Sequence, residues 1–554
     1  MKNKSYPLYE LPTIVNLKEL LIQKKKTQPD KVAFIEEKKR GERIQKTYRE
    51  VYDEVAALGT YLWDKGLCNR HIAIIGENSY EWLLCFFAVV NGGGVAVPID
   101  KELPEGEIAK LLQKADVEYI FCSEKYQKKV ENAVRLIQGK GIIIDVMSQQ
   151  DKYIADGYPK LSAQNNPYTA YEIDRQKTCC ILFTSGTSGE SKGVMLSHQN
   201  IAADINGSCK LFAPSGGTVA VLPFHHAFGL VVGVFMMFHY GYPVFLNRSL
   251  KTIPKDLQSA KPQTLFFVPL FVETFYKQIW AAARKDGKEK LLKKTMRCSD
   301  ILLRLGIDIR KKAFKSVQQV FGGNLEYIVC GGAPLGTQYI KAFRSWGIEI
   351  LNGYGTTECS PCIAVNRNRY HKDGTVGMTY PNIEVKVSAD GEILVKGAIV
   401  MQGYYKNPAE TDRVLCNGWY ATGDIGCVDR DGFITLTGRK KNLIILSNGE
   451  NISPEELEAD FLKDMAVSEV LVKERQGLLA AEIYPDKSYL TEIHKDGDVA
   501  AYFEQLRQTV NKSRPFYKQI SVIELRDTEF DKNTSRKIVR YKEEKGVQDV
   551  RKSN

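Results

Sequence analysis

The sequence predicts an α/β protein: a large N-terminal domain of parallel and mixed sheets with helices plus a β-rich subdomain, followed by a small α+β domain. Three observations predict this class. Short apolar runs alternate with longer amphipathic ones from residue 72, the pattern becomes strictly alternating after residue 377, and a basic break at residues 439–441 precedes a shorter mixed region. At 554 residues the chain is also too long for one ordinary hydrophobic core.

The first part of the chain has the pattern of strands separated by helices. Its apolar runs are three or four residues long, and an amphipathic helix is expected over residues 79–90. Strands that alternate with helical stretches are typical of parallel sheets. The expected strands are Ile72–Ile75, Val95–Val97, Tyr119–Cys122, Ile142–Ile144, Val219–Leu222, Leu265–Val268, Tyr327–Cys330 and Glu349–Leu351.

The pattern of apolar and polar residues changes twice in the later part of the chain. Residues 383–387 alternate apolar and polar side chains, Asp390 and Gly391 supply a turn, and residues 393–395 resume the alternation, which predicts a β-hairpin. After the basic break, Ser453 starts a helix and residues 501–510 form another. We therefore predict an N-terminal domain over residues 1–439 and a C-terminal domain over residues 440–554.

Two features of the sequence bear on whether the protein is secreted or spans a membrane. Residues 1–7 are followed by no apolar segment and no cleavage site of a secretory signal, so we expect a cytoplasmic protein. The longest apolar run, Phe228–Leu246, is interrupted by glycine, histidine and proline. A buried helix followed by a strand is favoured there over a membrane span.

The twelve cysteines have no framework spacing, as expected for reduced thiols in a large intracellular protein. Cys359 and Cys362 have CxxC spacing without a second pair at zinc-site distance. Ordinary core or site-lining thiols are favoured for this pair, and a zinc or redox site is the alternative.

The excess of positive charge lies in the first 439 residues, because the rest of the chain holds 20 basic and 21 acidic residues. Between Lys277 and Lys315 there are 13 basic and 4 acidic residues, interleaved with apolar ones. A solvated helical face is one interpretation, and attraction to anionic lipid or polyanionic substrates is the other. The second interpretation includes peripheral contact with the inner face of the membrane. No nucleic-acid partner is expected.

A loop of small residues suited to phosphate follows the apolar residues 181–183. Its glycines, hydroxyls and single lysine allow backbone N–H groups and an ammonium to converge on phosphate oxygens. Gly193 follows Lys192 where a Walker A motif needs Ser or Thr, so the loop is of another kind. A flexible surface turn is the alternative. The candidate residues are Thr184, Ser185, Gly186, Thr187, Ser188, Gly189 and Lys192.

A second cluster strengthens the nucleotide-binding interpretation. Tyr354 offers an aromatic face for a base, neighbouring threonines offer hydroxyls for phosphate, and Glu358 offers a carboxylate for Mg²⁺. Asp424 is an acid suited to a ribose diol, and Arg439 belongs to a cationic pivot. The cluster comprises Asn352, Gly353, Tyr354, Gly355, Thr356, Thr357 and Glu358, and another strand ends at Gly332, Ala333 and Pro334.

With these motifs in this order, the chain resembles the adenylate-forming superfamily, from about Leu17 to Arg540. Residues 222–229, the basic helical insert and residues 438–458 look like its long-chain fatty acyl-CoA synthetase branch. The resemblance implies that residues Thr184 to Lys192 hold the ATP phosphates, with Thr184 and Glu358 on Mg²⁺. It implies that Tyr354 stacks near adenine, flanked by Gly332, Ala333 and Pro334.

The resemblance also assigns roles outside these loops. Asp424 would bind the ribose hydroxyls, and Arg439 the ribose and phosphate region. His226 would stand at the entrance of the acyl pocket; a satisfied core histidine is the alternative. The small domain would be mobile about Lys441, and its loop at Gly449 and Glu450 would enter the site for thioester formation.

The last catalytic lysine of the family lies near the C-terminus, in an element of the type Gly-Lys-Ile-x-Arg. Lys537 matches it, but Arg536 replaces the usual glycine, which puts the local turn in doubt. An ordinary surface lysine is the alternative for Lys537.

The implied reaction is ATP-dependent activation of a medium- to long-chain fatty acid as acyl-AMP, followed by thioester formation with coenzyme A. Mg²⁺ is the implied cofactor, with ATP and coenzyme A as cosubstrates. Alternatives are an acyl-carrier-protein acceptor, a fatty acyl-AMP ligase that releases the adenylate, and a non-enzymatic relative that binds ATP.

Overall fold

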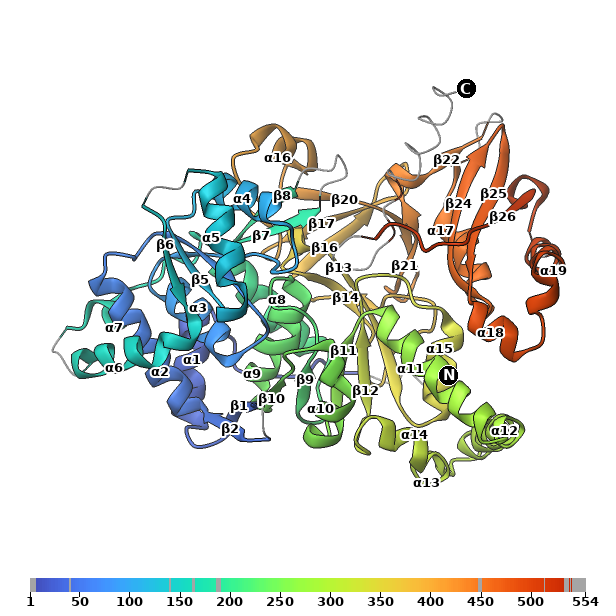
Figure 1. The fold of residues 1–554 in the computed structure, drawn as a ribbon, viewed down its shortest axis with the longest axis horizontal. Coiled ribbons are helices and arrows are strands. Elements are labelled where there is room, and N and C mark those ends of the chain that lie inside the picture. Colours follow the sequence, from blue (N-terminus) through green and yellow to red (C-terminus); the bar gives the residue numbers. More distant parts are fainter. Residues whose placement is uncertain are drawn as a thin grey trace.

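The structure is a computed structural model that describes residues 6–38, 41–138, 141–161, 165–185, 191–446, 451–512, 514–532, 538 and 540. Figure 1 shows helices around several sheets in the larger part of the molecule, with the last elements of the chain gathered on one side. The α/β class with mixed sheets and a smaller C-terminal unit is confirmed. Within the described residues, no helix is both long enough and apolar enough to cross a membrane.

The largest sheet has seven strands in the order β18-β8-β7-β4-β3-β5-β6. The strands from β7 to β6 run parallel, whereas β8 and β18 are antiparallel to their neighbours. Helices α2 (Tyr48–Asp64), α3 (Tyr80–Asn91) and α4 (Glu105–Lys114) connect or cover its early strands. The strands are β3 (His71–Ile75), β4 (Val95–Pro98), β5 (Tyr119–Cys122), β6 (Ile143–Val146), β7 (Thr178–Ser185), β8 (Ser191–Ser197) and β18 (Gly403–Tyr404).

A second sheet of five strands has the order β11-β12-β13-β14-β15. Its first three strands are parallel, and β14 and β15 are antiparallel. A four-stranded sheet, β2-β1-β10-β9, packs into the same hydrophobic core. The strands are β11 (Thr264–Phe267), β12 (Tyr327–Cys330), β13 (Glu349–Gly355), β14 (Cys362–Val365), β15 (Met378–Thr379), β1 (Val32–Glu37), β2 (Arg43–Thr47), β9 (Thr218–Ala220) and β10 (Val244–Leu246).

The predicted strands are therefore largely confirmed, with small shifts at their ends. The apolar run from Phe228 forms a π-helix (Phe228–Met236), a short helix α9 (Met237–Tyr240) and strand β10, as the prediction of a helix followed by a strand requires. Nearly all its side chains are buried in the main core.

The predicted hairpin is also confirmed, because β16 (Ile383–Val387) pairs antiparallel with β17 (Glu392–Gly397). Both belong to a β-rich sheet completed by β19 (Leu415–Cys416), β20 (Trp419–Val428) and β21 (Ile434–Arg439).

The C-terminal elements have a hydrophobic cluster of their own, from Ile452 to Ile520. Helices α17 (Pro454–Phe461) and α19 (Val499–Asn511) confirm the two predicted helices. They pack with the sheet β24 (Val467–Arg475), β25 (Leu478–Pro485) and β26 (Val522–Leu525). A separate core agrees with a separate domain, while the boundary at residue 440 stays a prediction.

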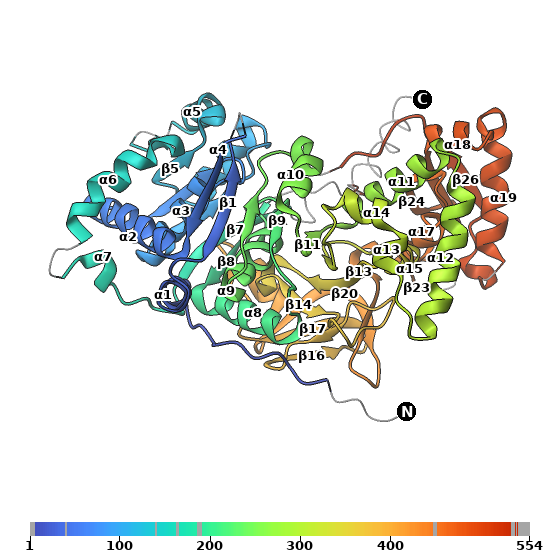
Figure 2. The same cartoon turned by 90° about the horizontal axis from the view of Figure 1, so that it is seen from below.

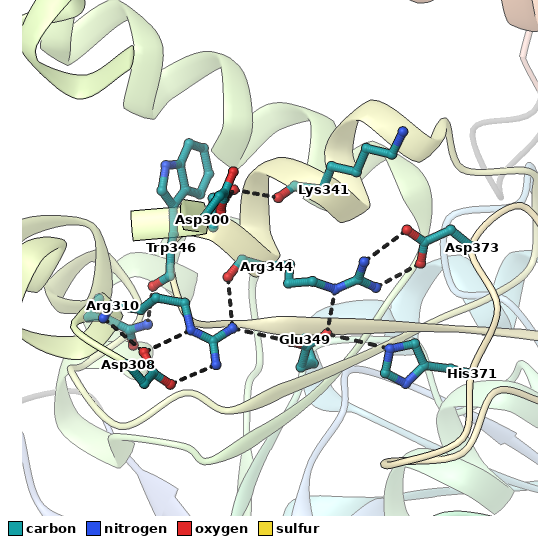
Figure 3. A network of polar contacts seen from close by, with 11 residues as sticks. Asp300, Asp308, Arg310, Lys341, Arg344, Trp346, Glu349, His371 and Asp373 are labelled. Carbon is teal, nitrogen blue, oxygen red and sulfur yellow. Dashed lines mark hydrogen bonds and ion pairs between the residues drawn. The ribbon is translucent and has the colours of Figure 1, made fainter. Parts of the chain in front are cut away.

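The basic segment forms α11 (Pro269–Lys285), α12 (Glu289–Arg304) and α13 (Arg310–Ala313), and Figure 2 shows α12 at the outer edge of the molecule. A polar network anchors this insert. Arg310 pairs with Asp308 and Glu349, and Arg344 of α15 (Thr337–Ser345) pairs with Glu349 and Asp373 (Figure 3). Since Glu349 begins β13, the network joins the insert to the strand that carries the second nucleotide motif.

Candidate active site

Strands β7 and β8 flank the centre of the predicted phosphate loop. Strands β7 and β8 pair antiparallel, with Thr184 opposite Lys192. The prediction treated the whole stretch from Thr184 through Lys192 as a loop, and this was wrong for Thr184 and Ser185, which lie on β7, and for Lys192, which lies on β8. Backbone pairing with β7 gives this polar segment its extended form. Gly186, Thr187, Ser188, Gly189 and the side chain of Ser185 lie outside the described residues.

Lys192 is held between an acidic and an aromatic side chain. Its ammonium pairs with the carboxylate of Glu410 and lies 5.1 Å from the ring centroid of Tyr404. Hydrogen bonds from Arg413 and then from Lys192 lower the pKa of Glu410 to about 2, against the opposing effect of burial. Glu410 is therefore an anion at neutral pH, and the Lys192 side chain, 13% exposed, has a charged partner.

The second motif lies largely on β13. Asn352, Gly353, Tyr354 and Gly355 are strand residues, so the prediction that the motif follows a strand was wrong by four residues. A side chain at Gly355 would meet the carbonyl oxygen of Pro361 at 1.8 Å, which explains the glycine. Thr356 follows the strand, and Thr357 and Glu358 lie in a 3-10 turn.

Glu358 is fixed from two sides. Its Oε1 accepts a hydrogen bond of 2.9 Å from the hydroxyl of Tyr404, and its backbone carbonyl accepts one of 2.8 Å from the N–H of Met401. Both donors come from one short segment that also reaches Lys192. The two candidate phosphate- and metal-binding motifs are therefore connected through Tyr404.

Tyr354, Asp424 and Arg439 form a second network. The Tyr354 hydroxyl donates to Oδ2 of Asp424 at 2.8 Å, and Nε of Arg439 lies 2.7 Å from Oδ1. Burial, followed by the nearby Asp424 carboxylate, raises the pKa of Tyr354 well above its usual value, so the phenol remains a donor. Asp424 and Arg439 sit opposite each other on β20 and β21.

The glycine segment after β12 adjoins these motifs. Gly332 has φ +87°, a conformation that side chains other than glycine rarely adopt, and it precedes Ala333 and Pro334. A Cβ added to Gly331 would lie 3.3 Å from the carbonyl oxygen of Gly353 and 3.6 Å from the ring of Phe228. The segment therefore lies between the nucleotide motif and the start of the π-helix.

His226 lies just before that π-helix, with its ring centroid 4.3 Å from that of His225. Burial, and then the neighbouring His226, lowers the pKa of His225 far below its ordinary value. His225 is thus neutral at physiological pH, and its 3.6 Å contact with Asp100 is not an ion pair. Long π-helices are rare and frequently mark functional sites.

The segment predicted to be a cationic pivot forms a 3-10 turn, Lys440–Asn442, at the end of β21. Lys440 pairs with Asp390 at 2.6 Å and with Glu392 at 2.8 Å. Partial burial, followed by the charges of Arg439, Lys192 and Arg540, lowers the pKa of Lys441. Lys441 therefore lies close to the candidate nucleotide site.

Three predicted residues, Gly449, Glu450 and Lys537, lie outside the described residues. Residues 533–536 and 539 lie outside them as well, whereas Ile538 and Arg540 are described. Ile538 forms an antiparallel bridge with Lys532, and the Arg540 guanidinium pairs with Glu458.

Sequence reasoning missed Tyr404 and Glu410, which contact predicted site residues from a distant part of the chain. It also missed Asn78, whose side-chain amide donates to the carbonyl of Leu222 at 2.8 Å and accepts from the N–H of Phe224 at 3.1 Å. These bonds shape the loop that carries His226. No residue pattern signals such contacts, because each depends on how distant strands pack.

The residues fit Mg²⁺ bound together with a nucleotide. Glu358 has one carboxylate oxygen beyond the one bonded to Tyr404, and Thr184 supplies a hydroxyl. In the described ranges no group of three or more His, Cys, Asp or Glu residues could hold a metal ion. Mg²⁺ commonly binds through one or two carboxylates plus substrate phosphates and water, which suits a site with few protein ligands. Cys359 and Cys362 are both free thiols.

The chain is similar to curated proteins over most of its length. It is 27% identical over 450 residues to the long-chain-fatty-acid–CoA ligase FadD15 of Mycobacterium tuberculosis, which covers 77% of this chain and 74% of that protein. It is 29% identical over 507 residues to the long-chain-fatty-acid–CoA ligase 5 of Rattus norvegicus, with 83% and 74% covered.

Solved structures share the fold. The anthranilate CoA ligase AuaEII, in complex with anthranoyl-AMP, has a TM-score of 0.76 at 20% identity and covers 99% of each chain. ATP-bound MatB from Rhodopseudomonas palustris has a TM-score of 0.75 at 22% identity, with 97% of this chain and 99% of that chain covered. The family model described as AMP-binding enzyme matches residues 21–405, and this chain therefore belongs to that adenylate-forming family.

Proposed function

We propose that this protein activates a medium- to long-chain fatty acid with ATP to an acyl-AMP and transfers the acyl group to coenzyme A. The observation that carries the proposal is the Tyr404 side chain, which contacts both Lys192 and Glu358 and so joins the two motifs. The Tyr354, Asp424 and Arg439 network supplies groups suited to a nucleoside. The curated relatives named as fatty-acid–CoA ligases support the choice of substrate and acceptor.

In the first half-reaction, the fatty-acid carboxylate attacks the α-phosphorus of ATP and pyrophosphate leaves. Mg²⁺ held by Thr184 and Glu358 would neutralise phosphate charge. Lys192 and the N–H groups of the β7–β8 hairpin would bind the phosphates, and Lys537 would stabilise charge that develops in the transition state. Tyr354 would pack near adenine, with Asp424 and Arg439 at the ribose.

The second half-reaction requires the thiol of coenzyme A to reach the acyl carbon. Rotation of residues 440–554 about Lys441 would remove Lys537 and bring in the loop at Gly449 and Glu450. The thiol sulfur then forms the thioester bond and AMP leaves. The separate hydrophobic cluster from Ile452 to Ile520 supports movement of this part as a unit.

The acyl chain would bind along the segment after His226. The π-helix is apolar throughout and buried from Gly229 to Met236, and the Phe228 ring lies 6.4 Å from that of Phe266 on β11. Each buried methylene contributes up to about 0.8 kcal/mol, so long acids bind better than short ones. Adjacent chain lengths differ little, since about 0.8 kcal/mol for one methylene is only a roughly fourfold preference.

Pyrophosphate exchange into ATP, measured across a panel of carboxylic acids, tests the first half-reaction. We expect dodecanoate and hexadecanoate to support exchange and acetate and amino acids to be nearly inactive. Preference for acetate, an aryl acid or an amino acid would overturn the fatty-acid assignment. Absence of exchange with every acid would favour an ATP-binding relative without turnover.

Purified coenzyme A and acyl carrier protein, offered separately to the acyl-AMP-loaded enzyme, test the acceptor. The near-neutral residues 440–554 offer no general basic surface for an acidic carrier protein, so coenzyme A is expected. Release of acyl-AMP without either thioester would identify an acyl-AMP ligase.

We also propose that α12 contacts an anionic membrane surface. Its solvent face carries the exposed apolar side chains of Leu291 (60% exposed) and Ile301 (57%), and Leu305 (71%) follows directly after its last residue. The same face carries the exposed basic residues Lys290, Lys293, Lys294, Arg297 and Arg304, and Asp300 instead turns inward to Ser345. Exposed apolar side chains and nearby Lys and Arg supply the two attractions that hold a helix at an anionic membrane surface, burial of apolar area and electrostatic attraction.

Sedimentation with vesicles tests this surface. We expect binding to vesicles that contain phosphatidylglycerol and weak binding to vesicles of phosphatidylcholine alone. The double variant Ile301→Ser, Leu305→Ser should lose binding, whereas Leu250→Ser, an exposed apolar position elsewhere, should keep it. Equal binding by both variants would contradict the proposal.

A further inference from the structure

A short segment between the second motif and the β-rich sheet contacts both candidate phosphate- and metal-binding elements. We call residues 401–413 the bridging segment. The N–H of Met401 donates to the carbonyl of Glu358 at 2.8 Å, and the N–H of Tyr405 donates to the carbonyl of Gly193 at 2.8 Å. Between them, β18 pairs with β8, placing Tyr404 opposite Val194. The backbone of the segment is thus fixed against both elements.

The side chain of Tyr404 also contacts both elements. It is 5% exposed, its hydroxyl donates to Oε1 of Glu358 at 2.9 Å, and its ring lies 5.1 Å from the Lys192 ammonium. Burial, followed by the Glu358 carboxylate, raises the pKa of Tyr404, so its hydroxyl keeps its proton and remains a hydrogen-bond donor at physiological pH. One oxygen of Glu358 is therefore engaged, which orients the carboxylate and leaves the other for a cation.

Glu410 completes the arrangement around Lys192. A lysine side chain has many rotamers, and ordering it costs conformational entropy. The carboxylate of Glu410, itself held by Arg413 at 2.5 Å, pairs with the ammonium. The Lys192 ammonium is thereby kept on the ring face of Tyr404 before any phosphate arrives.

We infer that Tyr404 is a positioning residue that orients the metal-binding carboxylate of Glu358 and the phosphate-binding ammonium of Lys192 together. The inference rests on the proposed function. Two parts of the Tyr404 side chain have separate effects. The hydroxyl orients the Glu358 carboxylate and therefore affects metal binding. The ring orients the Lys192 ammonium and therefore affects triphosphate binding.

Two substitutions separate these parts. Tyr404→Phe removes the hydroxyl and keeps the ring. The affinity for Mn²⁺ should then fall by about tenfold, because one hydrogen bond to a charged group is lost. Electron paramagnetic resonance in the presence of a non-hydrolysable ATP analogue measures this affinity. At saturating metal the KM of this variant for ATP should stay near that of the unaltered protein. Tyr404→Leu removes the ring as well and should raise the KM for ATP even at saturating metal.

Tyr405→Phe is the matched control, because the hydroxyl of Tyr405 donates to Asp116 at 2.7 Å rather than to Glu358. It should change neither Mn²⁺ binding nor the KM for ATP. In a Glu358→Gln background, Tyr404→Phe should cause no further loss of Mn²⁺ binding, since both changes affect one metal ligand. Thermal unfolding of each variant reports whether the fold is kept.

The outcomes separate this inference from the proposed function. Equal Mn²⁺ binding by folded Tyr404→Phe and Tyr405→Phe would overturn the role of Tyr404 and leave the adenylating activity standing. Absence of carboxylate-dependent pyrophosphate exchange in the unaltered protein would overturn the proposed function, while the Mn²⁺ measurement would still test the Tyr404 contact. Equal weakening of metal and ATP binding in Tyr404→Phe would contradict the division between hydroxyl and ring.

Discussion

The hydroxyl of Tyr354 donates a hydrogen bond of 2.8 Å to Asp424, which joins the candidate adenine-binding and ribose-binding residues of two different sheets. Tyr354→Phe removes this bond and keeps the ring. Because the bond to a buried carboxylate contributes about 1.5–3 kcal/mol, its loss lets Asp424 rotate, and we expect the KM for ATP to rise about tenfold or more with a smaller change in kcat. Initial rates of pyrophosphate exchange against ATP concentration measure this. A fall in kcat at constant KM would contradict the assignment.

The strands were predictable where a short apolar run lies between turn residues. Tyr119–Cys122 and Tyr327–Cys330 match their predicted bounds because all four residues of each run are suited to a buried strand. Lys192 was not predictable as a strand residue, since Ser191 to Gly193 is polar and its pairing with β7 decides its conformation.

The residues of the candidate site could likewise be predicted only in part from the sequence. Tyr354, Glu358 and Asp424 could be found from local motifs, since each motif has its chemistry within a few residues. Tyr404 and Glu410 could not, because their importance comes from contacts with residues at least 46 positions away. Such contacts depend on the tertiary packing of β18 against β8.

Lys24 should make stability depend on pH. It is 7% exposed, and burial lowers its pKa from 10.5 to about 8. Between these values the unfolded chain binds more protons, so the contribution of Lys24 to the free energy of unfolding rises with pH from about 8 to 10.5. Below pH 8 the buried charge costs about 3 kcal/mol.

Lys24→Met should therefore stabilise the protein at pH 7 and remove this part of the pH dependence. Denaturant unfolding at pH 7, 8.5 and 10 measures it. Lys26→Met, at an exposed position of the same helix α1 (Leu17–Thr27), is the control and should have little effect. Identical stability changes in both variants at all three pH values would show that burial of Lys24 is not the cause.

Lys537→Ala should suppress adenylation by several kcal/mol of transition-state stabilisation and spare thioester formation from supplied acyl-AMP. Single-turnover rates of the two half-reactions measure this. Arg536→Ala, next to it, is the control for local damage to the segment before Ile538. Equal loss of both half-reactions in Lys537→Ala would show that this lysine is misassigned.

Lys441→Pro should restrict rotation of residues 440–554, because proline fixes φ near −65° at the proposed pivot. Adenylation should survive and thioester formation should fall. Lys441→Ala removes the same side chain without the ring, and so separates loss of the ammonium from loss of backbone freedom. If both half-reactions fall together in the proline variant alone, the pivot lies elsewhere.

The last prediction concerns the contact between α11 and α18 (Lys487–Glu492), which joins the two parts of the chain. The Arg284 guanidinium pairs with Glu492 and lies 5.3 Å from the ring centroid of Tyr489, and Lys277 pairs with Asp486 at 3.0 Å. Partly exposed pairs contribute about 1 kcal/mol or less each.

Arg284→Glu replaces this attraction with repulsion, so we expect the C-terminal part to leave this position more often. Trypsin should then cleave after Lys440 or Lys441 about fivefold faster. Mass spectrometry of the native-state digest identifies that cleavage. The charge swap Arg284→Glu, Glu492→Arg should restore slow cleavage, because it rebuilds the pair in reverse. Fast cleavage in the swap, or unchanged cleavage in Arg284→Glu, would show that this contact does not hold the two parts together.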